Sequence, residues 1–79
     1  MIIGDIVLSK SGRDKGCRYM VADIINEKFL LVCDGKHHSI QSPKTKNIKH
    51  VVKLSDGNPD YLSDKPGSDK KLYKYLNSD

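Results

Sequence analysis

The chain has no tryptophan, a single phenylalanine and no apolar stretch long enough to span a membrane. A membrane helix needs about 20 consecutive apolar residues, so we expect no membrane span. With so few aromatic rings, the sequence offers no obvious platform for stacking bases, which argues against sequence-specific reading of a single strand. Residues 1–5 lack the cationic start and long apolar core of a secretory signal. We therefore expect a cytoplasmic protein.

Residue sets typical of metal or catalytic sites are also missing. Cys17 and Cys33 lie inside apolar segments without metal-type spacing, so we expect two reduced, buried thiols. Adjacent His37 and His38 would point to opposite sides of a strand, and no carboxylate or thiolate has suitable partner spacing. No Ser–His–Asp set, nucleotide-binding glycine loop or carboxylate pair on apolar strands is present. We expect no metal, no cofactor and no catalytic residue.

Positive charge is concentrated in the first two thirds of the chain. The net charge of the 79 residues is +4. Residues 1–53 contain ten Lys or Arg and five Asp or Glu, a net +5, whereas residues 54–79 contain four and five, a net −1. A chain of this length forms one domain with a barely sufficient core. The first segment is where a nucleic-acid footprint is most plausible; the alternative is a solvated surface.

Short runs rich in β-branched and aromatic residues predict five strands. The predicted strands cover residues 5–9, 17–25, 29–33, 36–42 and 48–53. Asp34-Gly35 indicates a tight type I′ hairpin before the fourth strand, and Pro43 ends that strand. Phe29 is expected in the core. Tight turns between such strands predict a mainly β fold over residues 1–54, a small bent barrel of about five antiparallel strands.

Residues 55–79 are expected to form a turn-rich linker and a short helical appendage. Pro59 would open one helical turn over residues 60–62, and Ser68 would cap a helix over residues 69–77. Its apolar stripe has three members: Leu72, Tyr75 and Leu76. Because so short a helix is unstable alone, we expect it to dock on the barrel.

A cationic loop with glycine at each end is the first candidate site. Gly12 and Gly16 allow sharp turns and close approach of a ligand, since no Cβ blocks positive φ. Arg13 and Lys15 are the best candidates for phosphate contacts, because Arg grips two oxygens and Lys acts as a point charge. The alternative is an exposed pair that Asp14 partly neutralises.

The second candidate site is a lysine ladder. Lys44 and Lys46 would share one face if residues 43–47 are extended, and the alternative is a solvated edge whose lysines discourage strand addition. Tyr19 is expected in the core with its hydroxyl at the rim, rather than stacked on a base. The predicted RNA-binding residues are Gly12, Arg13, Lys15, Gly16, Lys36, Lys44, Lys46, Lys49 and His50.

Gly4-Asp5 opening a strand, followed by the loop at residues 11–16 and another strand, resembles the KOW motif. That motif occurs in SH3-like barrels of ribosomal proteins and transcription elongation factors. Residues 31–35 and 43–50 are further similar to small bacterial KOW-domain RNA-binding proteins, which are related to large-subunit ribosomal proteins of archaea and eukaryotes. The resemblance covers residues 2–53, places the family's loop glycine at Gly16, and implies an SH3-like barrel that binds structured RNA. The tail has no counterpart.

Taken together, the sequence predicts a monomeric RNA-binding protein that contacts ribosomal RNA or the ribosome, with ribosomal proteins as further partners. One alternative is an SH3-like protein–protein module that docks through tail tyrosines: Tyr61, Tyr73 and Tyr75. Added salt separates the two, because phosphate contacts weaken with salt and apolar contacts do not. Another alternative is a duplex-DNA-binding KOW module in transcription, which competition between duplex DNA and folded RNA would detect.

Overall fold

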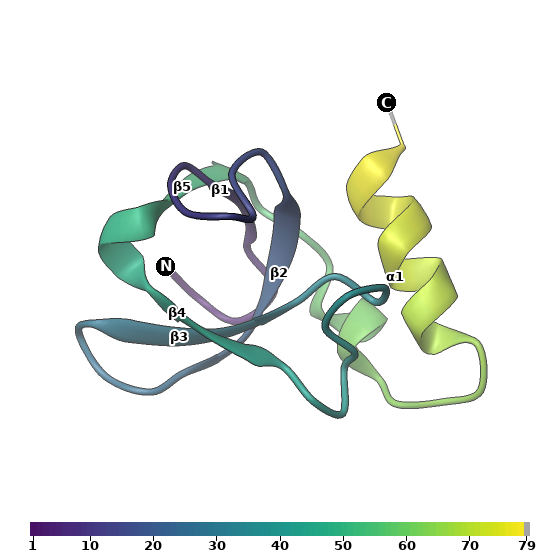
Figure 1. Ribbon diagram of the computed structural model, residues 1–79. Coiled ribbons are helices and arrows are strands. Elements are labelled where there is room, and N and C mark those ends of the chain that lie inside the picture. Colours follow the sequence, from purple (N-terminus) through teal and green to yellow (C-terminus); the bar gives the residue numbers. More distant parts are fainter. Residues whose placement is uncertain (79) are drawn as a thin grey trace.

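Five antiparallel strands form a single sheet in the computed structural model, which describes residues 1–78 (Figure 1). The strands are β1 (Ile6–Ser9), β2 (Arg18–Ile24), β3 (Phe29–Cys33), β4 (Lys44–Asn47) and β5 (Val51–Ser55). Their order across the sheet is β4-β3-β2-β1-β5. The predicted mainly β fold of five antiparallel strands with a C-terminal helix is confirmed. Closure into a barrel is not, because the sheet ends at β4 on one side and at β5 on the other.

Three helical segments complete the chain: the 3₁₀ turns η1 (Ile48–His50) and η2 (Pro59–Leu62), and the helix α1 (Ser68–Asn77). Pro59 is the first residue of η2, as the sequence predicts. The cap of α1 is Gly67, whose φ is 83°. Ser68 is therefore the first helical residue and not the cap, and its Oγ accepts a hydrogen bond from the Lys65 N–H (3.0 Å).

Two apolar clusters lie on opposite faces of β2. Tyr19 and Val21 point into one cluster, and Met20 points into the other, because successive strand residues alternate between faces. The first cluster unites side chains from four strands, so the sheet is curved around it: Val7, Tyr19, Val21, Leu30, Val32 and Val51.

The helix α1 covers the second cluster and docks on the sheet, as predicted (Figure 1). Leu72 and Leu76 are buried against Met20 and Cys33. Arg18 on β2 adds a polar contact, because its Nη1 donates to the Leu76 carbonyl (3.2 Å). Burial raises the pKa of the Cys33 thiol to about 12, so this thiol stays protonated at neutral pH.

Residues 36–42 form no strand, so the predicted hairpin is wrong. The Asp34 carboxylate, which is buried, accepts hydrogen bonds from three successive backbone N–H groups at 2.9 Å each. Such local bonds compete with a strand ladder. The Asp69 carboxylate of α1 binds the Ile40 N–H (2.9 Å) and holds the rest of this loop. The fourth strand consequently begins after Pro43, not before it.

The last predicted strand is displaced by a 3₁₀ turn. Residues 48–50 form η1 because the Asn47 side chain accepts the Lys49 N–H (2.9 Å) and caps the turn. The strand β5 follows from Val51. Phe29 was expected in the core but is 36 % exposed. It is the first residue of β3, and the alternation that buries Leu30 places Phe29 on the opposite face.

No helix within residues 1–78 combines the length and apolar character needed to cross a bilayer.

The docking of α1 predicts a large stability loss for Leu72→Ala. Leu72 is fully buried, and truncating such a leucine costs about 2 to 5 kcal/mol of unfolding free energy. Lys70→Ala, at an exposed position on the same helix, should change it by less than about 0.5 kcal/mol. Urea unfolding measures both. Equal midpoints for the two variants would mean that α1 is no part of the cooperative core.

Candidate nucleic-acid interface

The loop between β1 and β2 closes through its own backbone hydrogen bonds. The Gly16 N–H donates to the Ser9 carbonyl (2.8 Å), and the Cys17 N–H donates to the Asp14 carbonyl (2.9 Å). Gly12 and Gly16 have φ values of 89° and 92°, which residues with a side chain rarely adopt. A Cβ on Gly16 would meet no atom of the described chain within 4 Å. Glycine is thus needed here for backbone conformation.

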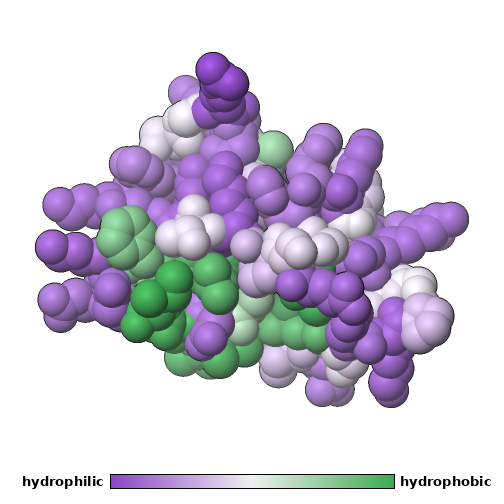
Figure 2. Space-filling model, turned by 60° about the horizontal axis from the view of Figure 1, so that its bottom comes forward, coloured by the Kyte–Doolittle hydropathy of each residue, from purple (hydrophilic) through white to green (hydrophobic). Residues whose placement is uncertain are grey.

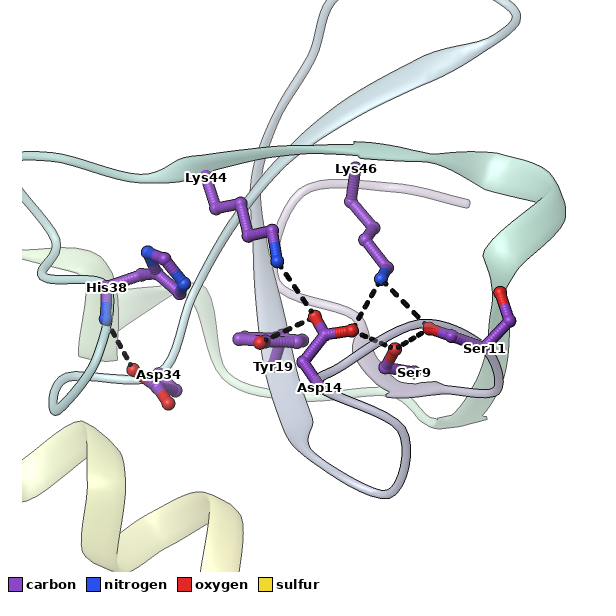
Figure 3. A network of polar contacts seen from close by, with 8 residues as sticks. All are labelled: Ser9, Ser11, Asp14, Tyr19, Asp34, His38, Lys44 and Lys46. Atoms are coloured by element: carbon purple, nitrogen blue, oxygen red, sulfur yellow. Dashed lines mark hydrogen bonds and ion pairs between the residues drawn. The ribbon is translucent and has the colours of Figure 1, made fainter.

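The Asp14 side chain points inward from this loop and joins it to β2 and β4 (Figure 3). Its Oδ2 accepts hydrogen bonds from the Tyr19 hydroxyl (2.8 Å) and from Lys44 Nζ (3.1 Å). Its Oδ1 accepts from Lys46 Nζ (2.8 Å) and from the Ser9 hydroxyl (2.9 Å). We call these five residues the Asp14 network.

Burial and hydrogen bonding act in opposite directions on Asp14. Burial raises the pKa of this carboxyl, but hydrogen bonds from Lys46, Tyr19 and two other side chains outweigh it and hold the pKa well below its usual range. For Tyr19, burial comes first and the bond to Asp14 second, and both raise the pKa of the phenol above its usual range. At neutral pH the Asp14 carboxylate is therefore ionised, and the Tyr19 hydroxyl keeps the proton that it donates.

The network brings the two predicted basic segments together. Lys44 and Lys46 contact the same carboxylate, so they do share a face. They differ in exposure, however: the Lys46 side chain is 7 % exposed and that of Lys44 is 34 % exposed. Lys46 Nζ also lies 3.4 Å from the Ser11 carbonyl. Lys46 is thus enclosed by protein contacts, whereas part of Lys44 still reaches solvent.

Exposed basic side chains lie around this junction. Arg13 and Lys15 flank Asp14 in the loop, and Lys49 and His50 lie on η1; all four are exposed. The Lys10 N–H donates to the His50 carbonyl (2.9 Å), which holds η1 against the start of the loop. Lys10 is exposed too. Lys10 was not among the predicted RNA-binding residues, although a lysine at the base of a cationic loop is itself a signal.

Lys36 does not join this group. Its Nζ lies 5.2 Å from the centre of the Tyr73 ring on α1, a distance typical of a cation–π contact. His38, from the same loop, lies beside Tyr19 with ring centres 6.1 Å apart. Asp34 binds the His38 N–H, as Figure 3 shows. This turn therefore connects the network to the helix.

Two other possible functions, base stacking by Tyr19 and metal binding, can be compared with the structure. Tyr19 is 1 % exposed, so its ring lies in the core as predicted and presents no face to a base. Among residues 1–78, no three His, Cys, Asp or Glu side chains gather closely enough to hold a metal ion.

The low pKa of Asp14 predicts an acid-sensitive fold. The unfolded carboxyl titrates near 3.8 and the folded one lower, so the unfolded state binds the proton first as the pH falls. Stability from this group is complete above about pH 5 and is lost progressively below about pH 4. Asp14→Asn should be less stable at pH 7 and lose less stability between pH 7 and pH 3. Urea unfolding at both values measures this.

Glu27→Gln is the matched control, since Glu27 is an exposed carboxylate outside the Asp14 network. It should keep the pH dependence of the unaltered protein. An Asp14→Asn variant with that same pH dependence would contradict the role given to the carboxylate.

No model of a known protein family matches this chain.

Proposed function

We propose that the protein binds the phosphate backbone of structured RNA and catalyses no reaction. The observation that carries this proposal is the Asp14 network, which fixes a glycine-bounded cationic loop against β4. The bond from the Lys10 N–H to the His50 carbonyl holds η1 beside that loop. Backbone recognition needs cations held at fixed positions more than it needs base-reading side chains. The binding surface comprises the exposed or partly exposed basic residues of the loop, β4 and η1: Lys10, Arg13, Lys15, Lys44, Lys49 and His50.

Arg13 and Lys15 have the leading role in this proposal. Their neighbour Asp14 turns inward, and its charge is balanced by the enclosed Lys46 and the partly exposed Lys44. Its negative charge therefore does not cancel theirs at the tip of the loop. The Arg13 guanidinium would grip two phosphate oxygens, and Lys15 would add a point charge.

Lys46 has a different part. Because its ammonium group is enclosed and paired with Asp14, it positions the loop and does not contact phosphate. Gly12 and Gly16 act through loop conformation, and the Gly16 N–H is already bound to Ser9. Lys36, which contacts Tyr73, lies outside the proposed surface.

The resemblance to small KOW-domain proteins supports a ribosomal target. We propose that the protein acts in the cytoplasm on ribosomal RNA or the assembled ribosome. Its strongest support is the agreement between the residues that carry the resemblance and the position of the loop in an SH3-like sheet. Shape and backbone contacts would give affinity for folded RNA over duplex DNA, and competition between the two measures that preference.

Removing loop cations should weaken RNA binding and reduce its salt dependence. For each phosphate that the protein no longer neutralises, the slope of log K against log salt should fall by about 0.7 on single strands and about 0.9 on duplexes. Arg13→Ala and Lys15→Ala should each show this, with unchanged unfolding midpoints because both positions are exposed. Filter binding of ribosomal RNA across a salt series is the measurement.

Lys70→Ala is the control, because it removes the same charge from an exposed position on α1. It should leave the slope unchanged. If all three variants behave alike, the effect is one of net charge, and the loop is not the binding site.

A second candidate function is protein binding, favoured by one observation. Apolar side chains gather in a broad area on the face shown in Figure 2. Exposed large apolar residues of the described chain are Met1, Ile2, Ile3, Ile24, Ile25, Phe29, Val52 and Leu54. Contiguous exposed apolar surface is typical of interaction sites. This surface supports protein binding as the second candidate, through residues other than the tail tyrosines.

Sedimentation with ribosomal particles separates the two candidates. RNA binding predicts release at high salt and by Arg13→Ala. Protein binding predicts retention at high salt, and release by Ile25→Ser combined with Phe29→Ser, two exposed positions whose change should leave the core intact. Retention of both variants at high salt would refute the phosphate-contact proposal, and release of Arg13→Ala alone would refute the apolar one.

A further inference from the structure

A groove runs between η2 and α1, in the tail that the KOW resemblance does not cover. Its larger part is a hollow of about 640 Å³. A smaller hollow of about 320 Å³ adjoins it, and Tyr61 and Lys71 line both. The groove is also lined by Asn58, Asp60, Ser63, Lys65, Ser68, Lys74, Tyr75 and Ser78. Volumes of this size are typical of ligand sites.

An aromatic pair forms one wall of the groove. The Tyr61 and Tyr75 rings stack with centres 4.0 Å apart and planes 10° apart. The Tyr75 hydroxyl accepts the Asn58 N–H (3.2 Å) and anchors the pair to the start of η2. The Tyr61 ring is thereby held in place before any ligand arrives, which lowers the entropy cost of stacking another ring on the pair.

The charge of the groove differs from that of the tail as a whole. Although residues 54–79 carry a net −1, three tail carboxylates bind elsewhere. Asp56 pairs with Lys53, Asp64 binds the Gln41 side chain, and Asp69 binds the Ile40 N–H.

Lysine is the main charged residue type along the groove. Lys65, Lys71 and Lys74 line it, and Asp60 is the carboxylate among its described lining residues. A groove with three ammonium groups beside a fixed aromatic pair suits a ligand that carries phosphates and flat rings.

We propose that this groove binds an unpaired segment of RNA, as a second contact besides the loop surface. Bases would stack on the Tyr61–Tyr75 pair, and the three lysines would neutralise the phosphates that join them. Polar groups of Asn58 and Ser63 would meet base edges or 2′-hydroxyls. The inference rests on the proposed RNA binding. It adds a site for single-stranded RNA to the phosphate contacts made by the loop surface.

Titration of the ¹⁵N-labelled protein with oligouridylate tests the site. Amide signals of Ser63, Lys65 and Lys71 should shift, and those of Gly12 and Gly16 should shift less. Lys65→Gln and Lys71→Gln should each lower the affinity about fivefold at about 0.1 M salt, the loss that a slope of about 0.7 for each neutralised phosphate implies. These lysines are exposed, so unchanged unfolding midpoints will show that the variants fold.

Two matched variants serve as controls. Lys70→Gln removes a neighbouring exposed charge of α1 outside the groove and should keep the affinity for oligouridylate. Arg13→Ala, measured beside it, should weaken binding to folded ribosomal RNA more than binding to oligouridylate. Inorganic polyphosphate, which has charge without bases, should shift the groove signals only weakly.

The outcomes distinguish this inference from the proposed function. If oligouridylate shifts only the loop signals, the groove is no RNA site, and the loop proposal stands. If polyphosphate fills the groove as tightly as oligouridylate, base stacking is refuted. If oligouridylate fills the groove but Arg13→Ala leaves folded RNA binding unchanged, the loop proposal fails and the groove stands.

Discussion

One carboxylate, that of Asp14, holds together parts of the chain that are distant in sequence. Taking a charged carboxylate out of water costs on the order of several kcal/mol, and here two ammonium groups and two hydroxyls offset the cost. The same contacts satisfy Lys46, which would otherwise be an enclosed cation without a partner. Neither charge can be removed without penalising the other. The position of the loop against β4 follows from this mutual dependence.

The Asp14 network is one case of a wider division between acids and bases in this protein. Asp5 and Asp34 are buried and bind backbone N–H groups, and Asp69 fastens the loop after β3 to α1. Several carboxylates are thus used to fix the fold, while Arg13, Lys15 and most lysines remain exposed. A net charge of +4 therefore understates how positive the outer surface is, since surface potential depends on which charges reach solvent.

Where side-chain periodicity decides the structure, the sequence was sufficient. The apolar stripe of α1 follows from the spacing of residues within one helix, and it is confirmed. The wrong strand predictions lie where a polar side chain competes with the hydrogen-bond ladder of the sheet for backbone N–H groups. Asp34 draws three N–H groups into a turn, and Asn47 caps η1. Gly35 also passes so close to the Asp69 backbone that a Cβ would collide with it, a packing constraint that local sequence does not contain.

The candidate RNA-binding site shows the same limit of prediction from local sequence. Lys46 and Lys49 belong to one lysine ladder in the sequence, yet one is enclosed beside Asp14 and the other is exposed on η1. The difference arises from a carboxylate 32 positions away along the chain and from a cap that turns the backbone at Asn47. Residue type and spacing identify which groups carry charge. Only the tertiary partner decides whether that charge stabilises the fold or is left to attract a ligand, so lysines three positions apart take opposite roles.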